Sequence, residues 1–179
     1  MGTHASGVLT GGLYIREITS MKEWIDDFKQ TVESAAPRLL SITEASSKEP
    51  RAEEKWSAKQ ILGHLVDSAA NNHARFVLAQ TKDDLLFPGY DQEAWVKINH
   101  YQERPWNELI DLWRAYNLQL HHLMAHAEAE KMRTPCTLHT LQEIAFKEVP
   151  QSEPVTLEYL MKDYVDHLKH HLSQIFSEA

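Results

Sequence analysis

Residues 157–176 read LEYLMKDYVDHLKHHLSQIF, and apolar side chains return every three or four positions along them. This period is that of an amphipathic α-helix, which buries its apolar stripe against other elements. Thr156 can cap the start of the helix with its hydroxyl. The stripe is formed by Leu157, Met161, Tyr164, Leu168 and Ile175. The sequence therefore predicts a last helix that extends to about residue 176.

Three further stretches have the same period. Ser20 with Glu23, and Ser57 with Gln60, have the spacing of a capping box, in which two side chains satisfy backbone N–H groups at a helix start. Pro105 suits the first turn of another helix. The predicted helices cover about residues 20–45, 57–82 and 105–131.

Long connections separate these helices. In the first, Asp91 can cap a minor helix, and the second carries prolines over residues 132–154. Four amphipathic helices without an alternating strand predict an all-α four-helix bundle. Val8–Ile15 is apolar, but glycines interrupt it, so we expect it to be irregular. We predict a flexible lead-in over residues 1–18 and one domain over residues 19–177.

The amino-acid composition argues against several classes of function and location. The net charge is -8, from 18 Lys and Arg against 26 Asp and Glu, which argues against nucleic acid or an anionic membrane as the main partner. A single cysteine, Cys136, excludes an internal disulfide and suits a reducing compartment. The chain shows neither a long apolar run nor a secretory signal pattern. We therefore expect a cytoplasmic protein that does not span a membrane.

The chain holds 11 histidines, and their positions on the predicted helices separate them. His167 and His171 are four residues apart, so their side chains lie roughly 6 Å apart on one flank of the last apolar stripe. His64 borders the apolar stripe of the helix predicted over residues 57–82. If these two helices run antiparallel, the three histidines come level. Such a set can hold one divalent metal ion.

Spacing alone is weak evidence for a metal site. His122 and His126 have the same spacing but lie opposite the apolar stripe of their helix, so we expect them to face solvent. His170 also points away from the core. The alternative to a metal site is that the three aligned histidines are partly buried and satisfied by neighbouring polar groups.

Five further polar residues are candidates for the surroundings of this site. Asp67 and Asp163 lie three or four residues from a site histidine, so each could accept an imidazole N–H or be a solvated helix charge. The amide of Asn71 borders an apolar stripe and suits structural hydrogen bonding. Tyr90 and Asp91 follow a Pro-Gly turn and could cover the pocket as a lid, although helix capping also explains Asp91.

Three stretches carry a family likeness: WSAKQILGHLVDSAANNHARF from residue 56, PGYDQEAW from residue 88 and LEYLMKDYVDHLKHHLSQIF from residue 157. They resemble the DinB-like superfamily, close to its YfiT-type metal-dependent hydrolases, over about residues 20–176. The resemblance implies an up-down-down-up four-helix bundle with one histidine ligand on the second helix and an HxxxH pair on the fourth. Matched residue by residue, these ligands are His64, His167 and His171.

The resemblance also implies a nickel or zinc ion with open coordination positions, and often a homodimer. Three neutral imidazoles leave the ion its full charge, so a bound water or thiol can ionise near neutral pH. Characterised relatives include transferases that use low-molecular-weight thiols such as bacillithiol or mycothiol, and many members are called hydrolases.

We therefore expect a metal-dependent hydrolase or thiol transferase that acts on a small molecule. The alternative is a non-catalytic, dimeric, stress-related protein whose metal is structural or absent. No catalytic side chain beyond the metal ligands is predicted.

Overall fold

The computed structural model describes residues 7–50 and 52–177, with side chains from Lys22 onward in the first helix. The long helices of this part of the chain are α1 (Gly7–Leu40), α3 (Ala58–Thr81), α5 (Trp106–Ala125) and α8 (Leu157–Phe176). Short helices occupy the connections: α2 (Glu44–Lys48), α4 (Gln92–Ile98), α6 (Ala129–Arg133) and α7 (Leu141–Ile144). Among the described residues only isolated β-bridges form. The predicted all-α class is confirmed.

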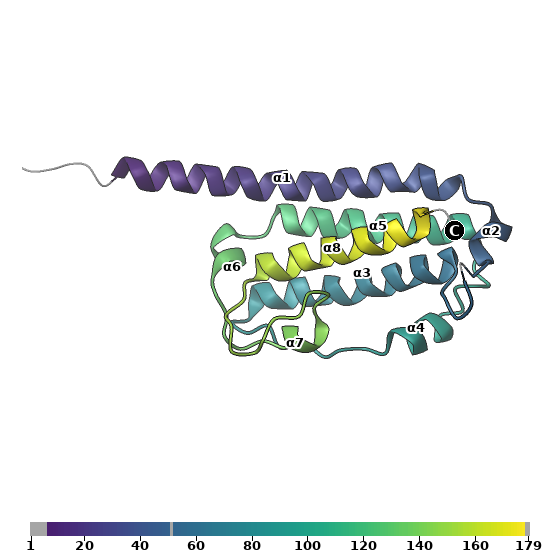
Figure 1. Ribbon diagram of the computed structural model, residues 1–179. Helices are drawn as coiled ribbons and strands as arrows, with labels where there is room; N and C mark the ends of the chain where they lie inside the picture. Colours follow the sequence, from purple (N-terminus) through teal and green to yellow (C-terminus); the bar gives the residue numbers. More distant parts are fainter. Residues whose placement is uncertain (1–6, 51, 178–179) are drawn as a thin grey trace, which may run out of the picture.

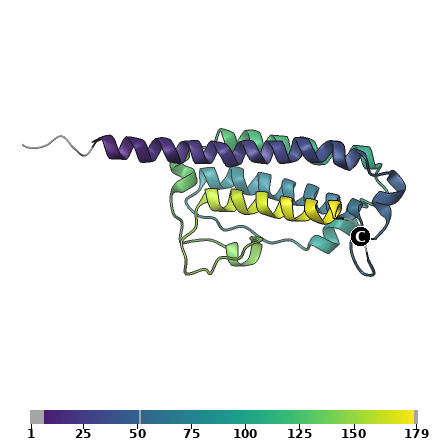
Figure 2. The ribbon, with the colours of Figure 1, turned by 45° about the horizontal axis from the view of Figure 1, so that its top comes forward.

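The path of the chain through the bundle is up-down-down-up (Figure 1). Helices α3 and α5 run in the same direction, opposite to α1 and α8, so the connection between them returns along the length of the bundle and carries α4. Around the bundle, α5 contacts α1 and α3, and α8 contacts α3 and α1. Figure 2 shows the same arrangement after a turn of the molecule. Helix α8 is therefore the antiparallel neighbour of α3.

One core lies between the four long helices. Phe28, Leu65, Trp113 and Leu168, one from each helix, are completely buried there. Full burial of such a side chain stabilises the fold by about 1.5–3 kcal/mol. No helix among the described residues has the length and apolar content needed to cross a membrane.

The predicted helix caps are present at three helix starts. Ser57 and Gln60 form the capping box of α3: the Gln60 N–H donates to Ser57 Oγ (3.2 Å) and the Ser57 N–H to Gln60 Oε1 (3.0 Å). Asp91 Oδ1 accepts the Ala94 N–H at the start of α4. Thr156 accepts the Tyr159 N–H at the start of α8. These polar groups set where the three helices begin.

The first helix starts earlier than predicted. It begins at Gly7 rather than at Ser20, so the interpretation of Val8–Ile15 as irregular was wrong; the side chain of Ser20 lies outside the described residues. Glycine costs a helix only about 1 kcal/mol relative to alanine and does not by itself end it. Residues 1–6 are also outside the described part, and the division into a lead-in and a domain stays a prediction.

Two helix ends were also predicted too late. Helix α1 ends at Leu40 and α5 at Ala125, and the short α2 and α6 follow them. In α5, the His126 N–H bonds back to the carbonyls of Leu123 and Met124, which closes the last turn. Apolar periodicity places a helix end only to within a few residues.

Candidate metal centre

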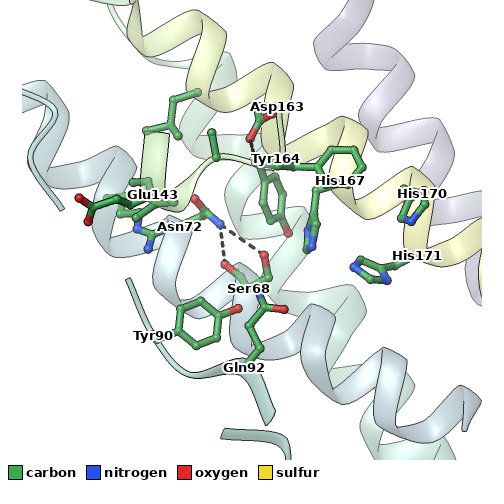
Figure 3. Close-up of a pocket in the computed structure, with 15 residues that line it drawn as sticks. Ser68, Asn72, Tyr90, Gln92, Glu143, Asp163, Tyr164, His167, His170 and His171 are labelled. Carbon is green, nitrogen blue, oxygen red and sulfur yellow. Dashed lines mark hydrogen bonds between the residues drawn. The ribbon is translucent and has the colours of Figure 1, made fainter. Parts of the chain in front are cut away.

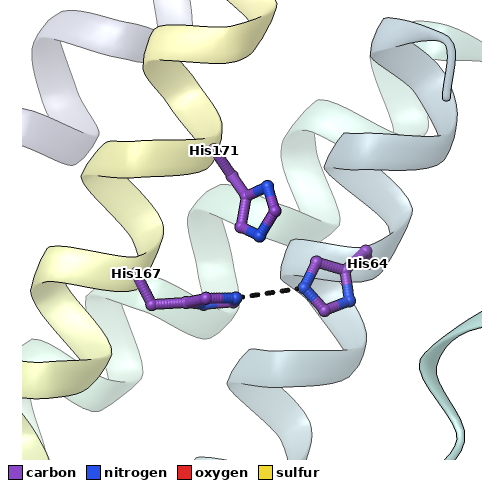
Figure 4. Close-up of side chains that lie close together, drawn as sticks. All are labelled: His64, His167 and His171. Atoms are coloured by element: carbon purple, nitrogen blue, oxygen red, sulfur yellow. Dashed lines mark hydrogen bonds between the residues drawn. The ribbon is translucent and has the colours of Figure 1, made fainter. Parts of the chain in front are cut away.

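Three histidine rings from two helices converge inside the bundle (Figure 4). His64 comes from α3, and His167 and His171 come from successive turns of α8. His64 Nε2 and His167 Nε2 are 3.1 Å apart, and one ligand nitrogen from each ring lies within 4.8 Å of the others. The ring centroid of His171 lies 4.8 Å from that of His64 and 4.5 Å from that of His167. The structure thus brings together the three residues selected from the sequence.

Close packing over α3 positions His64. A Cβ atom at Gly63 would lie 2.2 Å from Cδ2 of Tyr101, so only glycine lets this ring lie against the helix there. The Tyr101 hydroxyl donates to Asp67 Oδ1 (2.6 Å), and Asn99 Nδ2 donates to the same oxygen (3.0 Å). These bonds hold the segment after α4 against the turn of α3 that carries His64, which is completely buried.

Burial keeps the three imidazoles neutral. It lowers the pKa of His64 to about 4, with the His171 imidazole as a second cause. Burial and the neighbouring imidazoles hold the pKa of His167 far below its usual range. The pKa of His171 is also lowered by burial, against the effect of a hydrogen bond to Gln174. Neutral imidazole is the form that binds a metal ion.

Gln174 orients His171, a role that the sequence analysis missed. Gln174 Oε1 lies 2.8 Å from His171 Nδ1, and Gln174 Nε2 lies 3.1 Å from His170 Nε2. A carbonyl oxygen only accepts, so His171 Nδ1 carries the proton and the lone pair is on Nε2. The i, i+3 spacing to His171 was visible in the sequence, but many exposed glutamines have it. His170 is exposed, as predicted.

Neither aspartate proposed as a histidine partner has that role among the described residues. Asp163 accepts the backbone N–H of Phe146 on Oδ2 (2.8 Å) and that of Lys147 on Oδ1 (2.7 Å). Asp67 is bonded through Oδ1 to Tyr101 and Asn99, and its Oδ2 is buried without a partner in the described structure. Both carboxylates therefore hold connecting segments in place.

The other three candidates differ in position. Asn71 donates to the Asp67 carbonyl on its own helix, and Asp91 is used as the cap of α4. Tyr90 lines a cleft beside the histidines. Tyr90 therefore lies beside the site, whereas Asp91 does not line this cleft, and the lid role of this segment stays a prediction.

Two clefts meet at His171. The first, of about 330 Å³, also borders His167 and is lined by Ser68, Arg75, Tyr90 and Phe146 among others (Figure 3). The second, of about 440 Å³, is lined by Trp56, Ile61 and Gln174 among others. Phe146 packs its ring edge-on against His167, with centroids 5.5 Å apart, and Trp56 packs against His64 at 5.4 Å. The histidines are therefore both shielded and reachable.

His122 and His126 have the same spacing as His167 and His171 and serve as a comparison for the proposed metal site. The rings of His122, in the last turn of α5, and His126, directly after it, are 4.2 Å apart, yet both residues are exposed, as predicted. In the part of the chain that the structure describes, no third His, Cys, Asp or Glu joins them in a metal-binding group.

Comparison with known proteins places the chain in a family. The sequence profile of the DinB superfamily matches residues 27–175. The chain belongs to this superfamily. A protein of Oceanobacillus iheyensis is 29% identical over 172 residues, which cover 90% of this chain and 88% of the relative. YfiT of Bacillus subtilis is 26% identical over 162 residues, which cover 86% of this chain and 83% of YfiT.

Both relatives are named, provisionally, as metal-dependent hydrolases. The solved structure of YfiT, described as an unusual four-helix bundle, superimposes with a TM-score of 0.71 at 21% sequence identity. The superposition covers 87% of this chain and 83% of YfiT. This likeness confirms the predicted bundle topology of the DinB fold.

Proposed function

We propose that this DinB-superfamily protein is a metal-dependent hydrolase of a small molecule, with one nickel or zinc ion held by His64, His167 and His171. The observation that carries the proposal is the convergence of three neutral imidazoles, one buried and two half-buried, from two helices beside open clefts. The names of the relatives in Oceanobacillus iheyensis and Bacillus subtilis support the same activity.

The geometry of the nitrogens fits a shared ion. Imidazole nitrogens bind zinc at about 2.0–2.1 Å, so two of them in tetrahedral coordination lie about 3.3 Å apart. His64 Nε2 and His167 Nε2 are 3.1 Å apart, and the tautomer that Gln174 imposes turns the lone pair of His171 onto Nε2. Within the described residues no fourth His, Cys, Asp or Glu joins the group. Three protein ligands leave a position free, as catalytic zinc sites do.

The residues around the proposed metal site have different roles. A divalent ion in such a site supplies a Lewis acid and makes water acidic enough to ionise near neutral pH. Gln174 holds the proton on His171 Nδ1. Phe146 and Trp56 pack against the rings of His167 and His64. The clefts admit the substrate to the open side.

Metal loading tests the proposal directly. Protein purified without chelators should contain close to one divalent ion per chain, measured by elemental analysis. Adding nickel or zinc to metal-free protein at about a hundred times the dissociation constant should raise the free energy of unfolding by about 2.7 kcal/mol. The proposal fails if the protein contains no metal and neither ion raises the melting temperature.

Transfer to a low-molecular-weight thiol is a second candidate, supported by the meeting of two clefts at His171, through which two reactants could enter. Assays of metal-loaded protein with esters, amides and electrophiles, each with and without a thiol, separate the two reactions. A purely structural metal predicts no exchangeable coordination position and no turnover in either series. The predicted homodimer and cytoplasmic location stay predictions.

Acid should release the metal. Unperturbed histidine has a pKa near 6.5, and burial lowers that of His64 to about 4. Protons therefore compete poorly for the folded site, and we expect the metal to be retained down to about pH 5 and lost as the pH falls through about 4, where His64 protonates. Metal content measured after dialysis at stepped pH checks this. Full retention at pH 3 would indicate ligands other than histidine.

The metal-free protein should also lose stability in acid. The unfolded chain takes up protons below about pH 6.5, whereas folded His64 stays neutral until about pH 4, so the free energy of unfolding falls as pH drops through this window. Asp67 acts in the opposite direction, because burial raises its pKa to about 6 and its protonation favours the folded state. Urea unfolding of the native chain and of the His64→Ala variant isolates the histidine effect: the native chain should show the steeper loss in acid.

Gln174→Leu should weaken metal binding without removing it. The side chain fixes the tautomer of His171, and loss of such an outer hydrogen-bond partner typically costs about 10–100-fold in metal affinity. Competition with a metal-binding dye measures the change. Ser173→Ala, on the exposed side of the same turn, is the control and should keep native affinity. Equal metal affinities for the native protein and both variants would show that Gln174 does not contribute to the site.

A further inference from the structure

The first cleft leads away from the histidines along α3. Its wall on this helix is formed by Ser68, Asn72 and Arg75, which follow His64 at helical spacing. Asn72 Nδ2 donates to the carbonyl and the hydroxyl of Ser68, and both residues lie beside Tyr164 in the cleft (Figure 3). At 1.5 Å per residue, Arg75 is about 16 Å from His64 along the helix axis. The cleft can therefore hold an extended small molecule whose one end reaches the histidines and whose other end reaches Arg75.

The guanidinium of Arg75 is buried, and no acidic side chain among the described residues pairs with its charge. Arg75 is 6% exposed, and it donates from one guanidinium nitrogen to the Pro88 carbonyl (2.9 Å). Among the described residues, no carboxylate is within ion-pair distance of it, and burial lowers its pKa. The guanidinium nevertheless stays charged at neutral pH and has five N–H donors. A buried charge without a counter-ion is costly, so an anionic ligand is a natural partner for it.

Other groups at this end of the cleft suit one negative charge. Burial raises the pKa of Tyr90 to about 12, so its hydroxyl stays protonated and can donate. Of the carboxylates that line the cleft, Asp163 is already bonded to two backbone N–H groups, and Glu143 is exposed. With one fixed cation and these two acidic groups nearby, a singly charged carboxylate fits better than a doubly charged phosphate.

We infer that Arg75, with Tyr90, binds a carboxylate of the substrate, which identifies the substrate as a small monocarboxylate whose reacting bond lies near the histidines. The assignment of a reacting bond rests on the proposed function. The binding of the carboxylate does not, because it requires no metal. The proposed hydrolase function and the proposed carboxylate site can therefore be disproved independently of each other.

Metal-free protein at pH 7.5 tests the inference, since carboxylates cannot then bind to a metal ion. Hexanoate and its neutral analogue hexanamide are titrated by NMR. We expect hexanoate to bind at least tenfold more tightly and to shift the side-chain Nε–H signal of Arg75. Arg75→Gln should bind the two compounds equally. Arg114→Gln, which removes an exposed arginine of α5, should keep the native preference.

Three results would overturn the inference: equal binding of hexanoate and hexanamide to the native protein, an Arg75 signal that does not move, or tighter binding of inorganic phosphate than of hexanoate at Arg75. If Arg75→Gln fails to fold, the Arg75 signal of the native protein decides alone. If the native protein binds nickel or zinc but shows no preference for hexanoate, the carboxylate site falls and the metal centre stands. If the protein prefers hexanoate but binds neither nickel nor zinc, the carboxylate site stands and the metal centre falls.

Discussion

Replacing His64 with alanine is expected to abolish tight metal binding while leaving the bundle folded. In the proposed metal site, His64 would supply the ligand nitrogen from α3, whereas the other two proposed ligands share α8. Without it, an ion is held from one side only, and the affinity loss should exceed the roughly 10–100-fold cost of losing an outer hydrogen-bond partner. Isothermal titration of nickel and zinc into the variant measures the loss.

The fold should survive the loss of His64 because the stripes of four helices supply the buried apolar surface. Truncation of one buried side chain should lower the free energy of unfolding by about 1–3 kcal/mol. His126→Ala is the matched control, since it removes one member of the exposed histidine pair at the end of α5, and it should bind metal like the native protein. A helical His64→Ala protein with native metal affinity would exclude His64 from the site.

Asp163→Ala is expected to cause the largest loss of stability. Its carboxylate accepts the backbone N–H groups of Phe146 and Lys147, at 2.8 and 2.7 Å. Hydrogen bonds to a charged group contribute about 1.5–3 kcal/mol each, and their donors would lose this partner. We expect a loss of about 3 kcal/mol in the free energy of unfolding, measured by urea titration. Because Phe146 packs against His167, metal affinity should fall as well.

Asp166→Ala provides the control on the same helix. Asp166 forms an ion pair with Lys147 at 2.6 Å, but both side chains are well exposed. Such surface pairs contribute about 0–1 kcal/mol, so this variant should remain close to the native protein in stability and metal affinity. Equal losses for Asp163→Ala and Asp166→Ala would show that the two backbone bonds do not hold the loop.

Local features of the sequence predicted the helices and much of the site. The period of the apolar stripes, the caps at Ser57, Asp91 and Thr156, and the phase of His167 and His171 all depend on residues within one or two turns of each other. His64 came level with them only if the helices were antiparallel. The resemblance to the DinB-like superfamily implied that arrangement, and the path of the chain confirms it (Figure 1).

The tertiary structure decided what depends on distant partners. Asp163 lies four residues before His167, yet its carboxylate binds the N–H groups of a loop, while Gln174 bonds to His171. No periodic pattern marks a loop, so the contact of Phe146 with His167 could not be predicted either. The sequence by itself determined which residues share a helix face, because that follows from 3.6 residues per turn. Only folding determined which side chains meet across the bundle, because those contacts depend on how connections of no regular period return along it.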